Sequence, residues 1–122
     1  MANEITLTVG MQLVNSNLRA QFPQVSSQYT QTTAGMSDQV LSIGTSEEDV
    51  AMVDITTPGV CVLHNLDSTN FVKWGPKSGG AMIEMGRLKA GDKQVIRFGA
   101  SVTLRMIADT ATCKVRVMCL ET

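Results

Sequence analysis

Few side chains in this chain could act in catalysis, and the first to consider is His64, the only histidine. His64 lies in a largely apolar run, residues 60–66, beside Asn65. No serine stands in the Gly-x-Ser-x-Gly turn that presents a nucleophile to a histidine base. A cupin-like enzyme would need several metal-binding histidines. We therefore interpret His64 as a strand or turn residue and predict no catalytic residue and no enzymatic activity.

The three cysteines, Cys61, Cys113 and Cys119, could form a disulfide or bind a metal. Cys113 and Cys119 are six residues apart on one expected strand, about 20 Å at roughly 3.3 Å per residue, which is too far for a disulfide. Cys61 could pair with one of them only if their strands adjoin. Zinc sites of the usual Cys/His kind need a CxxC pair or more histidines. We predict three buried free thiols in a reducing compartment, with no metal and no cofactor.

The segment Gly75-Pro76-Lys77-Ser78-Gly79-Gly80 contains the residue types of a phosphate-binding loop, but in the wrong order. In a P-loop the lysine and the hydroxyl residue follow the last glycine and open a helix. Here they precede the double glycine, so we predict a flexible hairpin loop. The sequence leaves open a carboxylate pair for glycoside hydrolysis. However, the candidate acids mostly stand at expected turns, where acidic residues are common. These acids are Asp54, Asp67, Glu84, Asp92 and Asp109.

Three consecutive acids, Glu47, Glu48 and Asp49, could be read as a cation site. Adjacent acids cannot all face one ion, and the spacing of an EF-hand loop is absent. We interpret the segment as a solvated turn, with Thr45 or Ser46 as the cap of a single helical turn.

The composition excludes several classes of partner. With ten basic and eleven acidic residues the net charge is −1, and the basic residues are dispersed, which argues against nucleic-acid binding. No apolar run approaches the roughly 20 residues of a membrane-spanning helix. The first residues lack the basic and apolar segments of a secretory signal, so we expect folding in a cytoplasm.

The first 39 residues suggest a strand followed by an arm. Ile5, Leu7 and Val9 alternate with threonines, which predicts a half-buried strand that ends at Gly10. Residues 11–18 would form a second strand or a bend, because residues 15–17 are turn-like. The tract that follows, residues 20–39, is rich in Gln, Ser and Thr and poor in large apolar residues. We predict an extended arm or long loop that a partner orders, with Val25 and Tyr29 anchoring one strand.

The remainder, residues 40–122, reads as short strands separated by turns, with no helical periodicity over eleven or more residues. The central run is 60–63, and the clearest hairpin pairs residues 101–108 with 113–119 across a turn at 109–111. We therefore predict an all-β protein: one structural domain, a β-sandwich or jelly-roll-like barrel, with an extended N-terminal arm.

Candidate partner-binding residues come from the polar tract and from the only tryptophan. Aromatic residues make up 4% of the chain and eight residues are methionine, so the core must be aliphatic and the surface could be adaptable. Sugar sites usually recruit several aromatic residues, so packing in the core or at an interface suits Trp74 better. We assign partner contacts to Gln24, Val25, Gln28, Tyr29 and Trp74.

Most of the chain resembles a group of small virion structural proteins of tailed bacteriophages. The resembling segments are Met-Ala-Asn-Glu-Ile-Thr-Leu (1–7), Ser-Ile-Gly-Thr-Ser-Glu-Glu-Asp (42–49), Asn-Leu-Asp-Ser-Thr-Asn-Phe-Val (65–72), Gly-Pro-Lys-Ser-Gly-Gly (75–80), Leu-Lys-Ala-Gly-Asp (88–92), Val-Thr-Leu-Arg-Met-Ile-Ala-Asp-Thr-Ala (102–111) and the terminal strand. The resemblance implies a non-enzymatic β-sandwich or jelly-roll subunit of a virus particle.

Within that group the first expectation is a capsid decoration, or cement, protein that binds the exterior of the head and stabilises it. Its partners would be the major capsid protein and further copies of itself, a trimer by analogy with cement proteins. The alternatives are a neck, tail or fibre component and a carbohydrate- or receptor-binding β-sandwich. Assembly would take place in the host cytoplasm, with no nucleic acid or membrane as partner.

Overall fold

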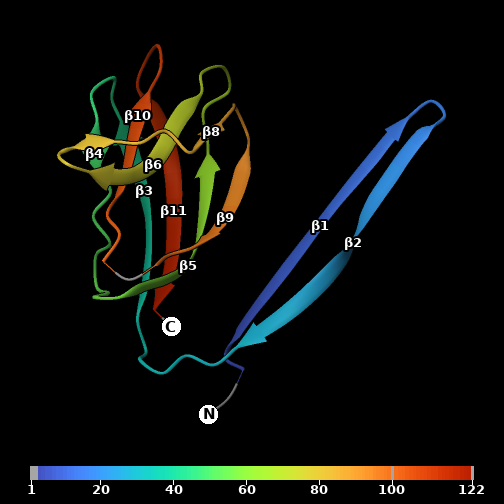
Figure 1. The fold of residues 1–122 in the computed structure, drawn as a ribbon, viewed down its shortest axis with the longest axis horizontal. Helices are drawn as coiled ribbons and strands as arrows, with labels where there is room; N and C mark the ends of the chain where they lie inside the picture. Colours follow the sequence, from blue (N-terminus) through green and yellow to red (C-terminus); the bar gives the residue numbers. More distant parts are fainter. Residues whose placement is uncertain (1–2, 100, 122) are drawn as a thin grey trace. The chain divides into compact units, whose positions relative to one another are not determined.

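The computed structural model describes residues 3–99 and 101–121, and these residues form strands and turns without any helix (Figure 1). The all-β class predicted from the sequence is therefore confirmed. The chain divides into two compact units, Met1–Thr33 and Ala34–Thr122. The boundary lies six residues before the one expected at 39/40, because residues 36–39 begin a strand of the second unit.

The first unit is a long antiparallel hairpin, called the arm below. Strand β1 (Ile5–Asn15) pairs with β2 (Leu18–Tyr29) along its whole length. Ser16 and Asn17 form the two-residue loop, and Ser16 has a φ of 53°, as the first loop residue of a tight hairpin requires. The turn predicted at residues 15–17 is confirmed.

Two expectations for the arm are wrong. The first strand does not end at Gly10: β1 continues to Asn15, and the register shifts between Val9 and Met11. The long loop expected as one alternative for the tract 20–39 is absent, because its first part belongs to β2 and its last part to β3, whereas the extended arm and the strand with Val25 and Tyr29 are present. Pairing with β1 satisfies the backbone of the polar residues, so they form a strand without burying large apolar side chains.

The second unit is a β-sandwich whose first sheet has four antiparallel strands in the order β3-β11-β5-β9. The strands are β3 (Met36–Ile43), β11 (Cys113–Glu121), β5 (Pro58–Asn65) and β9 (Lys93–Arg97). The apolar run 60–63 lies in β5, between β11 and β9, as expected of a central strand.

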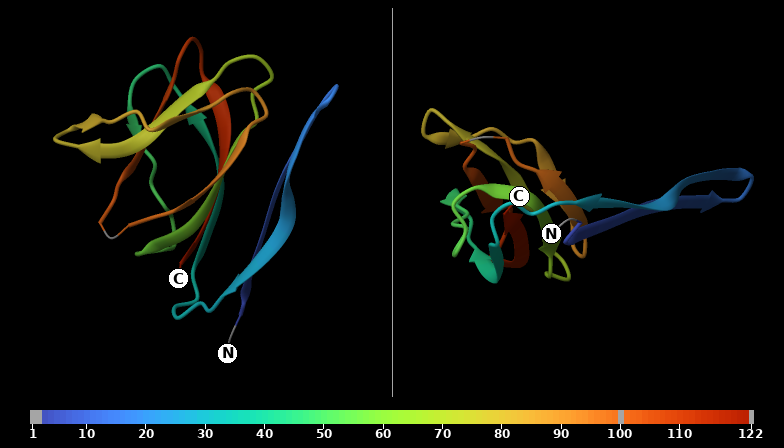
Figure 2. Two further views of the ribbon diagram at one scale, coloured as in Figure 1. Left: turned by 45° about the vertical axis from the view of Figure 1, so that its right-hand side comes forward. Right: turned by 90° about the horizontal axis from the view of Figure 1, so that it is seen from below.

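The second sheet has the order β4-β10-β6-β7, and β8 also pairs with β6. Its strands are β4 (Glu48–Asp49), β10 (Leu104–Ala108), β6 (Val72–Ser78), β7 (Ala81–Met82) and β8 (Gly86–Leu88). Figure 2 shows the curvature of these strands. Two further expectations are wrong here. Glu48 and Asp49 form strand β4 and not a helical turn. Residues 75–78 extend β6, so that only Gly79 and Gly80, with φ of 62° and 88°, make the turn.

The core lies between the two sheets and takes alternate residues of β10 and β11. Met106 and Ala108 enter it from one sheet, and Val115 and Val117 from the other. The hairpin predicted between these strands is therefore wrong, because β10 pairs with β6 and β4 whereas β11 pairs with β3 and β5. Both strands alternate because each covers one side of a shared core, so the pattern alone cannot distinguish a hairpin from a crossing between sheets.

Buried Asn65 holds the loops at the end of β5. Its Nδ2 donates hydrogen bonds to the carbonyl oxygens of Asn70 at 3.0 Å, Leu88 at 2.9 Å and Lys89 at 3.2 Å. Its Oδ1 accepts a bond from the Asp67 N–H at 2.9 Å. The loop at residues 66–69 is thus fixed by one amide group that is fully buried.

Candidate assembly surfaces

One face of the arm carries mostly apolar side chains along its length. Directly opposed residues of an antiparallel pair project from the same face, so the register assigns side chains to faces. On one face the opposed pairs are Ile5 with Tyr29, Leu7 with Ser27, Val9 with Val25, Met11 with Phe22, Leu13 with Ala20 and Asn15 with Leu18. We call these six rows the apolar arm face.

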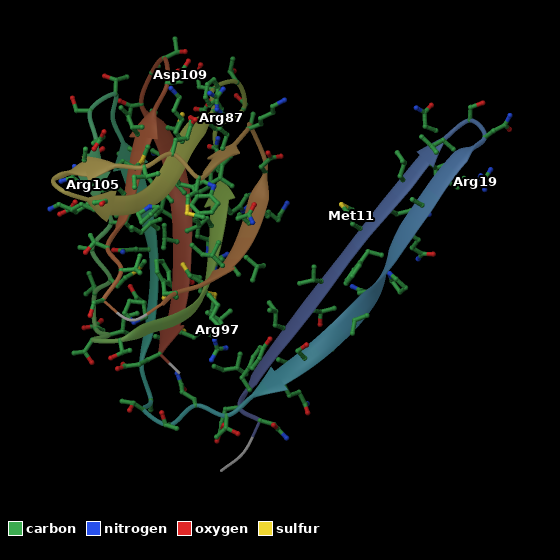
Figure 3. The ribbon with its side chains drawn as sticks, in the orientation of Figure 1. Met11, Arg19, Arg87, Arg97, Arg105 and Asp109 are labelled. Carbon is green, nitrogen blue, oxygen red and sulfur yellow. The ribbon has the colours of Figure 1, made fainter. Side chains whose placement is uncertain are left out.

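The opposite face of the arm is polar and almost uncharged. Its rows are Thr6 with Gln28, Thr8 with Ser26, Gln12 with Gln21 and Val14 with Arg19. The hydroxyl groups of Thr8 and Ser26 lie 2.8 Å apart and hydrogen bond across the strands. At the base, the Gln31 N–H donates to Glu4 Oε2 at 3.1 Å. Figure 3 labels one residue of each face, Met11 on β1 and Arg19 on β2.

A bulge in β2 keeps the apolar side chains on one face. Val9 is paired with Val25 and Met11 with Phe22, so two residues of β2, Pro23 and Gln24, stand opposite Gly10 alone. The alternation in β2 changes phase at this point, and the extra residue compensates for the change. Proline has no N–H to contribute to the ladder, so a bulge is one of the few strand positions that suit it.

The apolar arm face is open to solvent over most of its length. Met11 is 74% exposed, Leu18 60% and Phe22 55%. A hollow of about 500 Å³ is lined by apolar residues of two successive rows, Met11, Leu13, Ala20 and Phe22, and by Gln12 and Gln21. A contiguous exposed apolar surface of this kind is typical of an interaction site.

The partner residues chosen from the sequence are divided between the two units. Val25 and Tyr29 lie on the apolar arm face, Gln28 lies on the polar face, and Gln24 lies in the bulge. Met11, Leu13, Leu18 and Phe22 were missed by sequence reasoning, although the alternation of apolar residues on either side of Pro23 was a usable signal.

Trp74 lies in the sandwich, on β6, and packs partly buried against the core. Its indole edge covers Gly86, and its Nε1 is buried without a hydrogen-bond partner among the described residues. A pocket of about 250 Å³ opens beside the ring and is lined by Trp74, Pro76, Met85, Ile96, Arg97, Phe98, Gly99, Val102 and Leu104.

The outer face of the second sheet is held by ion pairs. Arg105 of β10 binds Glu47 at 2.8 Å and Asp49 at 2.6 Å, and its guanidinium also donates to the Gly80 carbonyl oxygen at 3.0 Å. These hydrogen bonds to Arg105 lower the pKa of both carboxyl groups and raise the pKa of the arginine. Two of the three consecutive acids are therefore structural partners of one arginine, whose position Figure 3 labels.

The three cysteines are free and buried, as predicted. Within residues 3–99 and 101–121, no three His, Cys, Asp or Glu side chains come together as a group that could hold a metal ion. No helix in the same residues is long and apolar enough to cross a membrane.

The fold and these surfaces define a β-sandwich protein with an amphipathic hairpin arm. Comparison with family models, curated proteins and solved structures gives no match.

Proposed function

We propose that this protein is a non-enzymatic structural subunit of a tailed-bacteriophage particle, bound to the exterior of the capsid as a decoration protein. The observation that carries the proposal is the apolar arm face, six rows long and carried on a two-stranded ribbon. The segments that resemble phage virion proteins supply the class of particle. The major capsid protein is the partner on the head.

The physical argument starts from the marginal stability of an isolated hairpin. Two strands alone bury too little apolar surface to be independently stable in water. An arm of this length therefore gains stability when its apolar face is covered, and assembly into a particle supplies such cover. The loss of conformational entropy on ordering the arm is then offset when that face is covered.

The rest of the chain is consistent with a role in assembly. The net charge of −1 suits a position away from the genome. Among the described strands, β3 and β9 are the edges of one sheet, and β4, β7 and β8 are edge strands of the other. Natural proteins cover or pair such edges, and packing between subunits of a particle does so.

The test is co-sedimentation of the purified chain with heads of the phage that encodes it, with bound copies counted per particle. We expect saturable binding at a copy number comparable with that of the major capsid protein. A handful of copies per particle would instead indicate a neck, tail or fibre component. Absence of binding to any part of the particle would contradict the proposal.

A truncated chain, residues 34–122, separates the contribution of the arm from that of the sandwich. It keeps Gly35, whose carbonyl oxygen accepts a 3.0 Å bond from the Glu121 N–H, and Met36, which pairs with Leu120. We expect this chain to bind particles far more weakly than the full chain. Full affinity of the truncated chain would show that the arm has no part in binding.

A further inference from the structure

The occupant of the apolar arm face can be inferred from what the chain itself offers. We propose that copies of this protein join one another through the apolar arm face, arm against arm, and so form a homo-oligomer. The inference deepens the proposed function by naming the partner of the arm. Self-association is measured without particles, however, so the two can fail independently.

The first sheet of the sandwich does not match the apolar arm face. On its outward side one row holds Met36, Leu120, Val60 and Arg97, and the next row holds Asp38, Met118, Val62 and Val95. The third row holds Val40, Arg116, His64 and Lys93, and the fourth holds Ser42 and Lys114. Each of these four rows therefore contains a charged side chain, and an apolar partner would remove water from it at a cost in free energy.

The outer face of the second sheet matches even less well. It carries Arg105 with its two acidic partners, and Lys73, which lies 3.5 Å from Asp109. Lys77 adds a 3.6 Å pair with Asp49 on the same side. Covering this face with an apolar surface would remove water from several charged groups without replacing their hydration. Neither outer face of the sandwich is therefore a suitable cover for the arm.

Another copy of the arm is a suitable cover. The apolar arm face contains no Asp, Glu, Lys or Arg, so two such faces meet without charge repulsion. Two ribbons of equal length, width and twist stack as two sheets do, at a spacing of about 10 Å. The row of Leu13 with the small Ala20 leaves a notch beside the bulky row of Met11 with Phe22. Alternating large and small rows allow side chains of the facing arm to interdigitate.

The apolar arm face is small for a stable protein–protein interface. Eleven residues at about 3.4 Å and two strands at about 4.8 Å give a footprint of roughly 350 Å². This is below the ~800 Å² that each partner of a stable complex usually buries. We therefore expect association that depends on protein concentration in the micromolar range. On a particle, joined copies would bind through several sandwiches at once and gain avidity.

Sedimentation equilibrium of the full chain, up to about 300 μM, tests the proposal. The test variant is the double substitution Met11→Glu with Phe22→Lys, which places an opposite-charge cross-strand pair on the apolar face. The control is Gln12→Glu with Gln21→Lys, which places the same pair on the polar face of the adjacent row. We expect the wild type and the control to associate, and the test variant to be monomeric or weakened by at least about tenfold.

A cross-linking experiment tests the same contact without the Met11→Glu and Phe22→Lys substitutions, which could unfold the arm. Leu13→Cys puts a thiol on the apolar arm face and Gln12→Cys puts one on the polar face, while the three native cysteines are fully buried. We expect a short bifunctional thiol reagent to join copies through Cys at position 13 and far less through position 12. Equal cross-linking at both positions would overturn the arm-to-arm contact.

The outcomes separate the inference from the proposed function. A wild type that is monomeric at every concentration but saturates phage heads would overturn the arm-to-arm contact and support the decoration role. A wild type that associates through the arm but binds no part of the particle would support the contact and contradict the decoration role. Equal association of test and control variants would show that another surface joins the copies.

Discussion

Cys61 on β5 lies directly opposite Cys119 on β11, and both side chains are fully buried. From the sequence, Cys61 could pair with another cysteine only if their strands adjoined, and β5 and β11 do adjoin. Both thiols are free. Contact with the Cys119 thiol, together with burial, raises the pKa of Cys61. Burial, with the nearby charge of Asp67, also raises the pKa of Cys113.

These raised pKa values predict a loss of stability at alkaline pH. In the unfolded chain the thiols ionise near pH 8.5, whereas the folded chain keeps Cys61 and Cys113 protonated at higher pH. Their contribution to the free energy of unfolding is therefore complete below about pH 8.5 and decreases above it, by at most about 1.4 kcal/mol per pH unit for each thiol. Urea titrations between pH 7 and 9.5 measure the slope. Cys61→Ala should reduce the slope, and rapid labelling of native Cys61 at pH 8 would contradict the raised pKa.

Removing the Asn65 side chain should destabilise the sandwich. Asn65→Ala leaves the carbonyl oxygens of Asn70, Leu88 and Lys89 and the Asp67 N–H without this partner. We expect a loss of about 2–4 kcal/mol in the free energy of unfolding, measured by urea denaturation. Asn70→Ala is the control, because only the backbone of Asn70 takes part, and it should cost less than about 0.5 kcal/mol. Equal effects of the two substitutions would show that the Asn65 amide is not the determinant of these loops.

A side chain at Gly86 should displace the tryptophan. A Cβ at Gly86 would lie 2.7 Å from Trp74 Cζ2 and 2.8 Å from Nε1, whereas one at Gly44 would approach nothing closer than 3.6 Å. We expect Gly86→Ala to cost about 1–3 kcal/mol of stability, because the ring must shift against the core. Trp74 is the only tryptophan, so its fluorescence should change in Gly86→Ala and remain constant in Gly44→Ala. An unchanged spectrum in both would contradict the contact.

The ion pairs of Arg105 predict a loss of stability in acid. Hydrogen bonds to Arg105 lower the pKa of Glu47 and Asp49. Their contribution to stability is therefore complete above the pKa of the same groups in the unfolded chain, near 4, and is lost as the pH falls through the lower folded values. Thermal unfolding of wild type and Arg105→Met between pH 6 and 2.5 measures this difference. The melting temperatures should converge at the acid end, and a difference that is constant with pH would contradict the assignment.

The sandwich should fold without the arm. Every member of the main core cluster lies between Ile43 and Cys119, and none comes from β1 or β2. We expect residues 34–122 to unfold cooperatively, with a melting temperature within a few degrees of the full chain. A second truncation, residues 37–122, removes Gly35 and Met36 and should be measurably less stable, because it loses the pairing with Glu121 and Leu120. Failure of the longer truncation to fold would show that the arm belongs to the core.

The sequence by itself determined the all-β class, the buried thiols, the turn at 15–17 and the central strand at 60–63, because these depend on composition and on alternation within a few residues. The alternation of apolar residues in β1 and in β2 is also visible in the sequence, but the alignment of the two strands is not. The alternation in β2 changes phase at Pro23, and only the pairing with β1 shows that a bulge brings the apolar residues of both strands onto one face. The positions of β10 and β11 in different sheets, and the pairing of Arg105 with Glu47 and Asp49, were likewise decided by tertiary structure. The alternation of apolar and polar residues indicates that one side of a strand is buried. Which strand lies beside it depends on contacts between residues far apart in the chain.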